Sequence, residues 1–594
     1  MKTLLTTLKG SLNQLLFGTD TRLPYEIEGN LPSEPAVRIT AVALGALALL
    51  ELVTFLWKGV FEVVVSRLWA VHGLFSVLYL IGIVCVVVVR DIRRGGFWFL
   101  LPFALAVPLC FWNIRGFGAL NTESLGELQH GLECLRTPGW GYMDASWGGY
   151  PSRIYLVNVV PTLLSGTSPE AYRLGFALPV FAGVLFFYAG LRRYFGQRAF
   201  AAPVSALCAA ATLTFPVVVW ITRTFETAVS PFAIGLWACG ALLVCATRPN
   251  LPSSLASAWT GGLLAAAFPP AVALVGLLIV VLGLWLVRSL SVRQRPVALM
   301  VAAITCYLMV FGFAMFVIRE KVFRSQPVDW ARKIKMFFSA VWMVLSVDQR
   351  SYAEVFTPAI LVFPLIAAIC FALSGRGGLL PLIGVVWCIP VIWACVTLQG
   401  KIAPQLPFAL YRAIVIVPVL VYVMATMSLR VDGGGPGRRW LVRGICLAVA
   451  GGLAWSAVVA YRSFKVFEPV RPPDVAESVM ARLLQRLPDV GLSPESKAVF
   501  LEKTGDGRLE RITAVSWYFL SGWTRPQRQE EPLWIHDQRS RRPGIILVRP
   551  DNPLVRESPP GYTVRTLRFG GREDPLIAPE IVGLVYLPRS EGRP

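Results

Sequence analysis

The chain has 594 residues, of which 55% are hydrophobic and only 15% are charged, and its mean hydropathy is +0.61. This composition excludes an ordinary soluble protein and predicts an integral membrane protein with several spans. The formal net charge of +21 does not by itself indicate a nucleic-acid partner, because Lys and Arg accumulate at the cytoplasmic ends of membrane spans.

The chain divides into three predicted regions. Residues 1–36 are mostly polar, with leucines at helical spacing beside Lys2 and Lys9, which predicts an amphipathic helix on the cytoplasmic membrane surface. Residues 37–461 contain apolar segments long enough to span a bilayer, which requires roughly 20 helical residues, and this length rule predicts about 13 transmembrane helices. They start near residues 38, 67, 96, 173, 200, 230, 256, 271, 297, 356, 379, 410 and 443.

Alternate loops between these spans are short and basic, which predicts that they are cytoplasmic. Examples are "RDIRRGG" (90–96), "LRRYFGQR" (191–198) and "TRPN" (247–250). The opposite loops then face outward: 113–172, 221–229, 319–355 and 398–409. Phe268, Pro269 and Pro270 interrupt one apolar run. This run forms either one kinked helix or two helices, and only two helices preserve the charge alternation.

Residues 462–594 form the third predicted region, a soluble α/β domain of about 130 residues on the outer side of the membrane. The proline-rich "EPVRPPD" links it to the last span, and "DVAESVMARLLQRL" has a helical pattern. Four short apolar runs follow that are typical of strands: "KAVFLEK", "GIILVRP", "YTVRTLRF" and "IVGLVYLP".

The first outward loop begins with "NTESLGELQH" (121–130), which combines two acids with one of only three histidines in the chain. In a helix, Glu123, Glu127 and His130 would share one face, opposite a face of leucines. Two interpretations remain open. The acids either form a solvated face above a membrane-buried leucine stripe, or they line a cavity. The next segment, "WGYMDASWGGYPSRIYL" (140–156), has aromatic residues that suit a sugar ring and equally an interfacial aromatic belt.

From residue 121 onward, the order of motifs resembles a known family. The acidic loop helix is followed by "TPGW", "GGYPSRIYL", "GTSPEAYRLGFALPVFAG" and "LRRYFG". This order is similar to the first outer loop and next span of bacterial lipid-linked sugar transferases of the GT-C class. The similarity is greatest to glycosyltransferase family 39, with its protein mannosyltransferase and aminoarabinose transferase relatives. The resemblance is strongest over residues 121–240, becomes weaker towards 430, and does not cover the C-terminal region.

The resemblance implies which residues form the site. The family's Asp-Glu pair reads Thr122-Glu123 here, so the first catalytic acid is Glu123. The second family acid, after an arginine in the next outer loop, corresponds to Glu226 after Arg223. The family's "KPPL" segment appears as "GYPS", which contains the substrate-binding candidate Tyr150. A late Arg-Tyr pair appears in reverse order as Tyr411-Arg412.

The resemblance also implies the reaction. Such enzymes transfer a sugar, usually with inversion, from a polyprenyl-phosphate-linked donor to an acceptor on the outer face of the cytoplasmic (inner) membrane. A carboxylate within hydrogen-bond reach of the acceptor hydroxyl can act as general base, the role expected of Glu123. Arg223, Lys401 and Arg412, at predicted outer ends of spans, would stabilise the leaving phosphate, although basic residues there also snorkel to headgroups.

The acidic residues also permit a divalent metal, because Glu123, Glu127, His130 and Glu226 offer oxygen and imidazole ligands; spacing alone does not establish the metal. Three other functions stay open: a transporter or flippase of lipid-linked sugars, an O-antigen ligase or polymerase, and an assembly protein that acts through its C-terminal domain. A transporter would place ionisable residues near mid-membrane, whereas the predicted span interiors here are nearly free of charge. The expected partners are the lipid-linked donor, an acceptor of unknown type and membrane lipid, and no nucleic acid.

Overall fold

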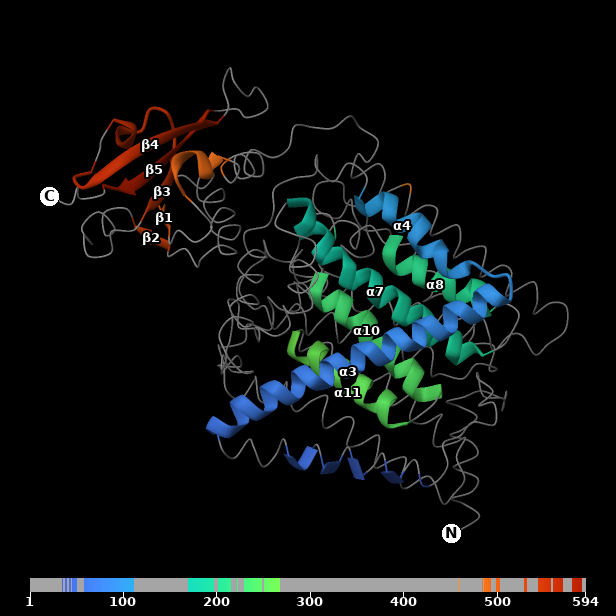
Figure 1. Ribbon diagram of the computed structural model, residues 1–594. Coiled ribbons are helices and arrows are strands. Elements are labelled where there is room, and N and C mark those ends of the chain that lie inside the picture. The colour runs from blue at the N-terminus through green and yellow to red at the C-terminus, as the bar shows by residue number, and fades with distance from the viewer. Residues whose placement is uncertain are drawn as a thin grey trace, which may run out of the picture.

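The computed structural model of the chain describes residues 58–111, 169–196, 201–214, 229–247, 250–267, 486–492, 498–502, 528–530, 543–556, 559–569 and 580–589 (Figure 1). It also describes isolated positions between 35 and 50, and residues 222, 458 and 483. The part of the chain up to residue 267 contributes helices, and the part from 486 onward contributes a β-sheet.

The helical part contains α3 (Lys58–Arg93), the 3-10 turn η1 (Trp98–Leu100), α4 (Leu101–Phe111), α7 (Pro169–Phe195), α8 (Ala201–Thr214), α10 (Val229–Thr247) and α11 (Leu251–Ala267). Each of these α-helices overlaps an apolar segment that the sequence predicts as a span. Within the described residues, only the 23-residue segment Val71–Arg93 of α3 is both long and apolar enough to cross a membrane. Shorter apolar helical segments are Ala201–Ala210 and Phe232–Cys245. The predicted total of about 13 spans depends on residues outside the described ranges.

Helix α7 begins earlier than the sequence predicts. The outer loop is expected to extend to residue 172, but the helix starts at Pro169. Proline is favoured in the first turn of a helix, because it lacks the N–H that would have no partner there and its φ angle is already helical. Residues 169–172 are therefore helical, while the extent of the outer loop relative to the membrane stays a prediction.

Helices α7 and α10 lie side by side in close backbone contact (Figure 1). A Cβ atom added at Gly240 of α10 would lie 2.6 Å from the carbonyl oxygen of Phe186 on α7, and one added at Gly190 would lie 2.8 Å from the Gly240 carbonyl oxygen. Trp237 of α10 donates a hydrogen bond from Nε1 to the Pro179 carbonyl oxygen at 2.8 Å. Small residues at such a contact let two apolar helices approach closely, as in membrane helix pairs.

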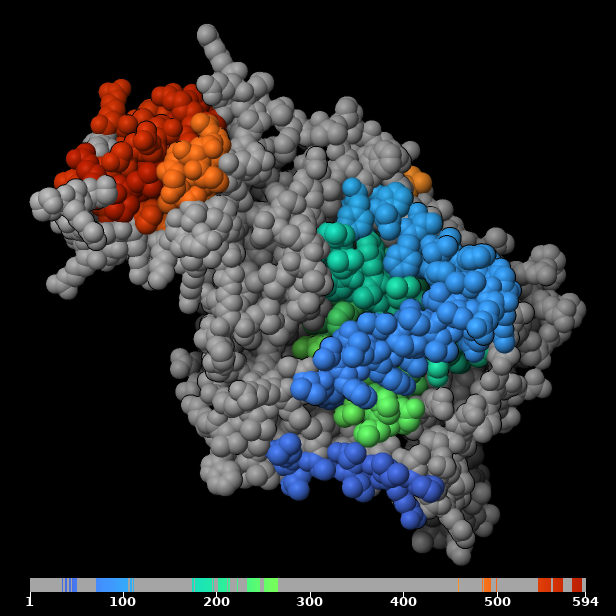
Figure 2. All heavy atoms as spheres, in the orientation of Figure 1, coloured from blue at the N-terminus to red at the C-terminus, as the bar shows by residue number. Residues whose placement is uncertain are grey.

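Helix α3 has one buried face and one exposed apolar face. Ser76, Leu80, Val87 and Asp91 are buried. The opposite side exposes large apolar side chains along the helix: Val71, Leu74, Phe75, Leu78, Ile81, Val86, Val89 and Ile92. Figure 2 shows the atoms of α3 and α4, in blue, uncovered on the visible face. A continuous apolar face of this length is expected of a helix that faces lipid.

Helix α11 begins with a reciprocal cap and is joined to α3. The Asn250 side-chain oxygen accepts from the Ser253 amide at 3.0 Å, and the Ser253 hydroxyl oxygen accepts from the Asn250 amide at 3.0 Å. This exchange satisfies two amides at the helix start. His72 on α3 donates from Nε2 to the Leu255 carbonyl oxygen at 2.8 Å. His72 is thus a hydrogen-bonded residue between α3 and α11.

The C-terminal sheet has the strand order β2-β1-β3-β5-β4. Its strands are β1 (Val499–Glu502), β2 (Arg528–Glu530), β3 (Gly544–Val548), β4 (Tyr562–Phe569) and β5 (Ile581–Pro588). Strand β1 pairs in parallel with β2 and β3, whereas β5 pairs antiparallel with β3 and β4. All five residues of β3 are buried, as expected of a central strand covered on both faces.

The core of this sheet comes from β3, β4 and β5. It consists of Ile546, Val548, Tyr562, Val582, Leu584 and Tyr586. Each of the four apolar runs in the sequence contains a strand, and β2 is an additional short strand that the sequence pattern does not predict. Of the described residues of the helix-like segment, those at 483 and 486 are helical and the one at 487 is in a turn. The limits of the predicted domain and its side of the membrane remain predictions.

Candidate functional site

The residues that the sequence assigns to catalysis and substrate binding lie outside the described residues. They are Glu123, Glu226, Arg223, Lys401, Tyr411, Arg412 and Tyr150, together with the metal candidates Glu127 and His130. Their proximity to one another and their roles stay predictions. In the part of the chain that the structure does describe, no group of three or more His, Cys, Asp or Glu side chains is placed to hold a metal ion.

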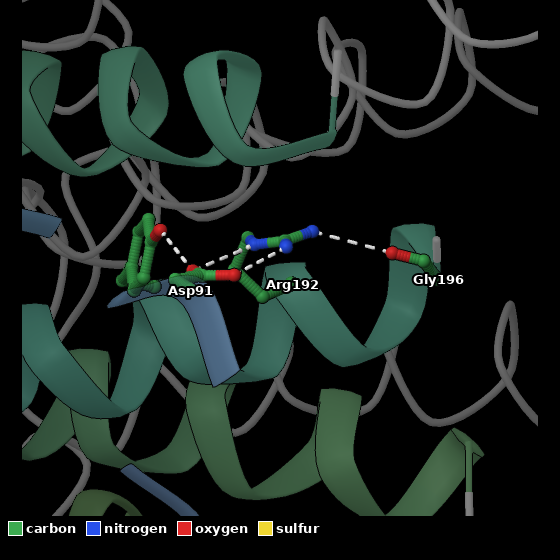
Figure 3. A network of polar contacts seen from close by, with 4 residues as sticks. Asp91, Arg192 and Gly196 are labelled. Carbon is green, nitrogen blue, oxygen red and sulfur yellow. Dashed lines mark hydrogen bonds and ion pairs between the residues drawn. The ribbon is translucent and has the colours of Figure 1, made fainter. Parts of the chain in front are cut away.

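The described helices enclose a polar network at the ends of α3 and α7. Asp91 of α3 accepts a hydrogen bond at Oδ2 from the Tyr188 hydroxyl at 2.7 Å and another from Arg192 Nε at 3.0 Å. Arg192 Nη2 donates to Asp91 Oδ1 at 2.5 Å, so the guanidinium binds both carboxylate oxygens. Figure 3 shows this pairing, with a further bond of 3.2 Å from Arg192 Nη1 to the Gly196 carbonyl oxygen.

The Asp91–Arg192 pair is almost completely removed from solvent, with side-chain exposures of 3% and 4%. Tyr188 is also buried. A buried ion pair is stable only when its geometry is good and its remaining polar atoms are satisfied, and the two-point contact and the tyrosine provide this. Because Tyr188 and Arg192 are four residues apart, they project from the same side of α7. The network therefore fixes the end of α3 to the end of α7.

Further arginines surround this network. We call Arg90, Arg93 and Arg94 of the α3 end, with Arg192 and Arg193 of the α7 end, the basic end of the helix pair. Cations in the last turn of a helix interact favourably with its carbonyl ends, and both helices carry arginines there. The contact between Asp91 and Arg192 also brings "RDIRRGG" and "LRRYFGQR" together, as expected if both loops lie on the same side of the membrane.

One guanidinium of the basic end is not satisfied by the described contacts. The Nε and Nη2 atoms of Arg90 are buried and have no hydrogen-bond partner. Both oxygens of the adjacent Asp91 carboxylate already accept from Tyr188 and Arg192. Among the described contacts, Asp91 is therefore bonded to Arg192 and Tyr188 and not to Arg90.

The apolar and charge patterns of the sequence do not predict this network. Asp91 stands in a basic run, whose charges were interpreted only as a sign of membrane orientation. The sequence contains two signals for it. Asp91 is the single acid in "RDIRRGG". Tyr188 and Arg192 are four residues apart, so they share one side of a helix, near the predicted cytoplasmic end of the span that starts near residue 173. A lone acid at a basic span end predicts an ion pair with a cation on a neighbouring helix.

No protein-family profile matches the chain, and no curated protein matches it in sequence. Among solved structures, it is similar to ArnT from Cupriavidus metallidurans in the apo state, with a TM-score of 0.47 and 14% identity, over 82% of this chain and 97% of that one. It is also similar to the same protein bound to undecaprenyl phosphate, with a TM-score of 0.38 and 16% identity, over 82% and 98% of the two chains.

Both matches are low in sequence identity and in TM-score. At identities and TM-scores this low, they assign neither an activity nor a substrate to this chain. The functional interpretation therefore depends on the chain's own residues.

Proposed function

We propose that the chain is a polytopic inner-membrane glycosyltransferase of the GT-C class. It transfers a sugar from a polyprenyl-phosphate-linked donor to an acceptor on the outer face of the membrane, with inversion. The observation that carries the proposal is the first outer loop, where Glu123 precedes "TPGW" and "GGYPSRIYL" in the order typical of glycosyltransferase family 39. The span-length apolar helix Val71–Arg93 supports the membrane location.

In the proposed mechanism, Glu123 removes the proton from the acceptor hydroxyl as its oxygen attacks the anomeric carbon. The bond from that carbon to the phosphate oxygen breaks, and the electron pair leaves with the lipid phosphate. The ionised carboxylates of Glu123 and Glu226 also stabilise the positive charge that develops on the sugar. A well-placed general base contributes about 100-fold to 10,000-fold to the rate.

Cations at the outer ends of spans complete the proposed site. Arg223, Lys401 and Arg412 hold the leaving phosphate, because oriented cations stabilise negative charge that accumulates in the transition state. Tyr150 and Tyr411 contact the sugar through their rings. If a divalent cation takes part, Glu127 and His130 are its additional ligands, and it supplies neutralisation of the phosphate.

The membrane orientation supports an outward-facing site. The contact between Asp91 and Arg192 joins two basic loops that the charge pattern assigns to the cytoplasm. Helix α4 runs away from this side and α7 returns to it. The loop between them, which contains Glu123, is then expected on the opposite side of the membrane.

The test uses the purified full chain and a labelled polyprenyl-phosphate-linked sugar in nanodiscs. Glu123→Gln is expected to lower the transfer rate about 100-fold or more, and Glu226→Gln is expected to lower it as well. Glu133→Gln is the matched control, because Glu133 is an acid in the same loop and has no proposed role. Undiminished transfer by both site variants would exclude the site, and movement of intact donor across the bilayer without bond cleavage would identify a flippase instead.

The C-terminal region has a separate proposed role in acceptor choice. A chain truncated at about residue 465 is expected to keep its ability to cleave the donor by hydrolysis while its preference among protein, glycan and lipid acceptors changes. Unchanged transfer to every acceptor would contradict this role.

A further inference from the structure

We propose that the outer edge of strand β4 binds an extended, acidic segment of a partner polypeptide, which adds to the sheet as a further strand. The outer edge is the side of β4 that faces away from β5. This surface belongs to the C-terminal sheet, and its role depends neither on Glu123 nor on sugar transfer.

Strand β4 ends the described sheet. The strand order is β2-β1-β3-β5-β4, so among the described strands only β5 pairs with β4. Figure 1 shows β4 along the margin of the sheet. Thr563, Arg565, Thr566 and Arg568 are exposed, so this strand is open to solvent. An exposed edge strand offers N–H and C=O groups with which another chain can pair.

The register shows which main-chain groups face the outer edge. In an antiparallel pair, residues alternate between those bonded to the partner strand and those whose N–H and C=O face away. The Arg589 amide donates to the Gly561 carbonyl oxygen at 2.9 Å, which extends the pairing of β5 with β4. The odd-numbered residues of β4 therefore bond to β5. The even-numbered residues present their main-chain groups to the outer edge: Tyr562, Val564, Thr566 and Arg568.

Contacts at the two ends of β4 agree with this assignment. The Tyr562 amide donates into the preceding turn at 3.2 Å, and Arg486 Nη1 donates to the Arg568 carbonyl oxygen at 3.1 Å. In the described part of the chain, no such contact engages the main-chain groups of Val564 and Thr566. These two residues leave two donors and two acceptors open at the middle of the edge.

The spacing of these groups fits a polypeptide. Residues two apart in a strand are separated by about 6.8 Å, because each residue rises about 3.4 Å. An extended peptide repeats its own donors and acceptors at the same interval and can form a ladder of main-chain hydrogen bonds with β4. A lipid headgroup or a sugar has no such repeat. The ligand class is therefore an extended polypeptide segment.

The charges on β4 select an acidic segment. The strand "YTVRTLRF" contains no acid. Arg568 is paired with Glu580 at 3.1 Å, whereas Arg565 has no ion pair among the described contacts. A residue of an antiparallel incoming strand that lies opposite Arg565 forms a non-hydrogen-bonded pair with it, where side chains are closest. Opposite charges in such a pair are stabilising, so the segment carries aspartate or glutamate at this position.

The same arginine disfavours a second copy of the chain as the occupant. Antiparallel pairing of residues 562–568 with the same residues of another copy would place Arg565 directly opposite Arg565 of the second copy. Like charges directly opposite each other are destabilising. Charged side chains on an edge strand are a known means of preventing self-association. The occupant is therefore a partner of opposite charge.

The first experiment measures peptide binding to the purified full chain in nanodiscs, by fluorescence anisotropy. The probe is a short dye-labelled peptide of alternating threonine and valine with a central glutamate, and its match has a central lysine. The glutamate peptide is expected to bind about twofold to fivefold more tightly. N-methylation of the amide next to the glutamate removes a donor that faces β4 and is expected to weaken binding about fivefold or more. N-methylation of the glutamate's own amide, which faces away, is expected to change it by less than about twofold.

Variants of the strand test the same contacts from the protein side. Thr566→Pro removes a donor at the outer edge without touching the ladder to β5, and it is expected to weaken binding about fivefold or more. Thr566→Ala keeps the donor and is the matched control. Arg565→Glu is expected to reverse the preference in favour of the lysine peptide. Arg556→Glu, at an exposed arginine outside the strand, is expected to leave the preference unchanged.

Four results would overturn the proposal. One is the absence of binding by either peptide. Another is an equal effect of the two N-methylations on wild-type protein, a comparison that stays decisive even if Thr566→Pro does not fold. A third is an unchanged charge preference in Arg565→Glu. The last is a dimer of the wild-type chain, seen by sedimentation, that Thr566→Pro dissociates, which would assign the edge to a second copy.

Discussion

Replacing Asp91 by asparagine tests whether the buried network holds α3 against α7. Asparagine has nearly the same shape as aspartate but no charge, and its amide nitrogen is not an acceptor. The substitution therefore leaves the Arg192 guanidinium buried at 4% exposure without its counter-ion. Tyr188 also loses a charged acceptor at 2.7 Å. We expect a large decrease in the free energy of unfolding.

The magnitude follows from the contacts. Asp91 accepts three hydrogen bonds, two of them from a guanidinium and one from a hydroxyl. Because both charged side chains are below 5% exposed, the solvent screening that weakens surface ion pairs does not apply. Removing one partner of such a pair costs about 3–5 kcal/mol. Tyr188→Phe removes only the third bond and is expected to cost about 1–2 kcal/mol.

The measurement is equilibrium unfolding of the purified chain in mixed micelles with increasing dodecyl sulfate, followed by far-ultraviolet circular dichroism. The double variant Asp91→Leu with Arg192→Met replaces the pair by apolar side chains and is expected to recover most of the stability, because no buried charge remains. The exposed Arg93→Gln is the control and is expected to change stability by less than about 0.5 kcal/mol. The reasoning is refuted if Asp91→Asn is no more destabilising than Arg93→Gln.

Two further predictions use the same unfolding measurement. Gly240→Ala places a methyl group 2.6 Å from the Phe186 carbonyl oxygen and is expected to lower the free energy of unfolding by about 1–3 kcal/mol. The control is Gly82→Ala, whose new Cβ has nothing within 4 Å; it is expected to be neutral or to stabilise α3 by up to about 1 kcal/mol. Equal effects of the two substitutions would contradict the close contact of α7 and α10. Asn250→Ala removes the reciprocal cap with Ser253 and is expected to lower the free energy of unfolding by about 1 kcal/mol. Asn250→Asp keeps a capping oxygen and is expected to retain stability. No difference between the two variants would exclude capping as the role of this side chain.

The described helices and strands could largely be located from the sequence, because their signals are local. Apolar runs of span length predict the positions of α3, α7 and α10, and short apolar runs between turn residues predict β3 to β5. Helix boundaries were less accurate. The start of α7 at Pro169 reflects the preference of proline for the first helical turn. A prediction from the length of the apolar run does not include this preference.

Sequence patterns do not identify the partners in the polar network, because it joins residues far apart in the chain. Asp91 and Arg192 are separated by 101 positions, and apolar periodicity does not specify which helices meet. The charge pattern does place both loops on one side of the membrane, and their contact agrees with it. The predicted catalytic residues Glu123 and Glu226 come from a family resemblance and lie outside the described residues.

The near contact of the α7 and α10 backbones has a consequence for motion. Two helices that touch at Gly190 and Gly240 have no side-chain layer between them that can rearrange, so sliding of one along the other would bring main-chain atoms into collision. They should move as one rigid body. Any hinge or shear that opens the protein to a substrate then lies at a boundary of this pair and not within it.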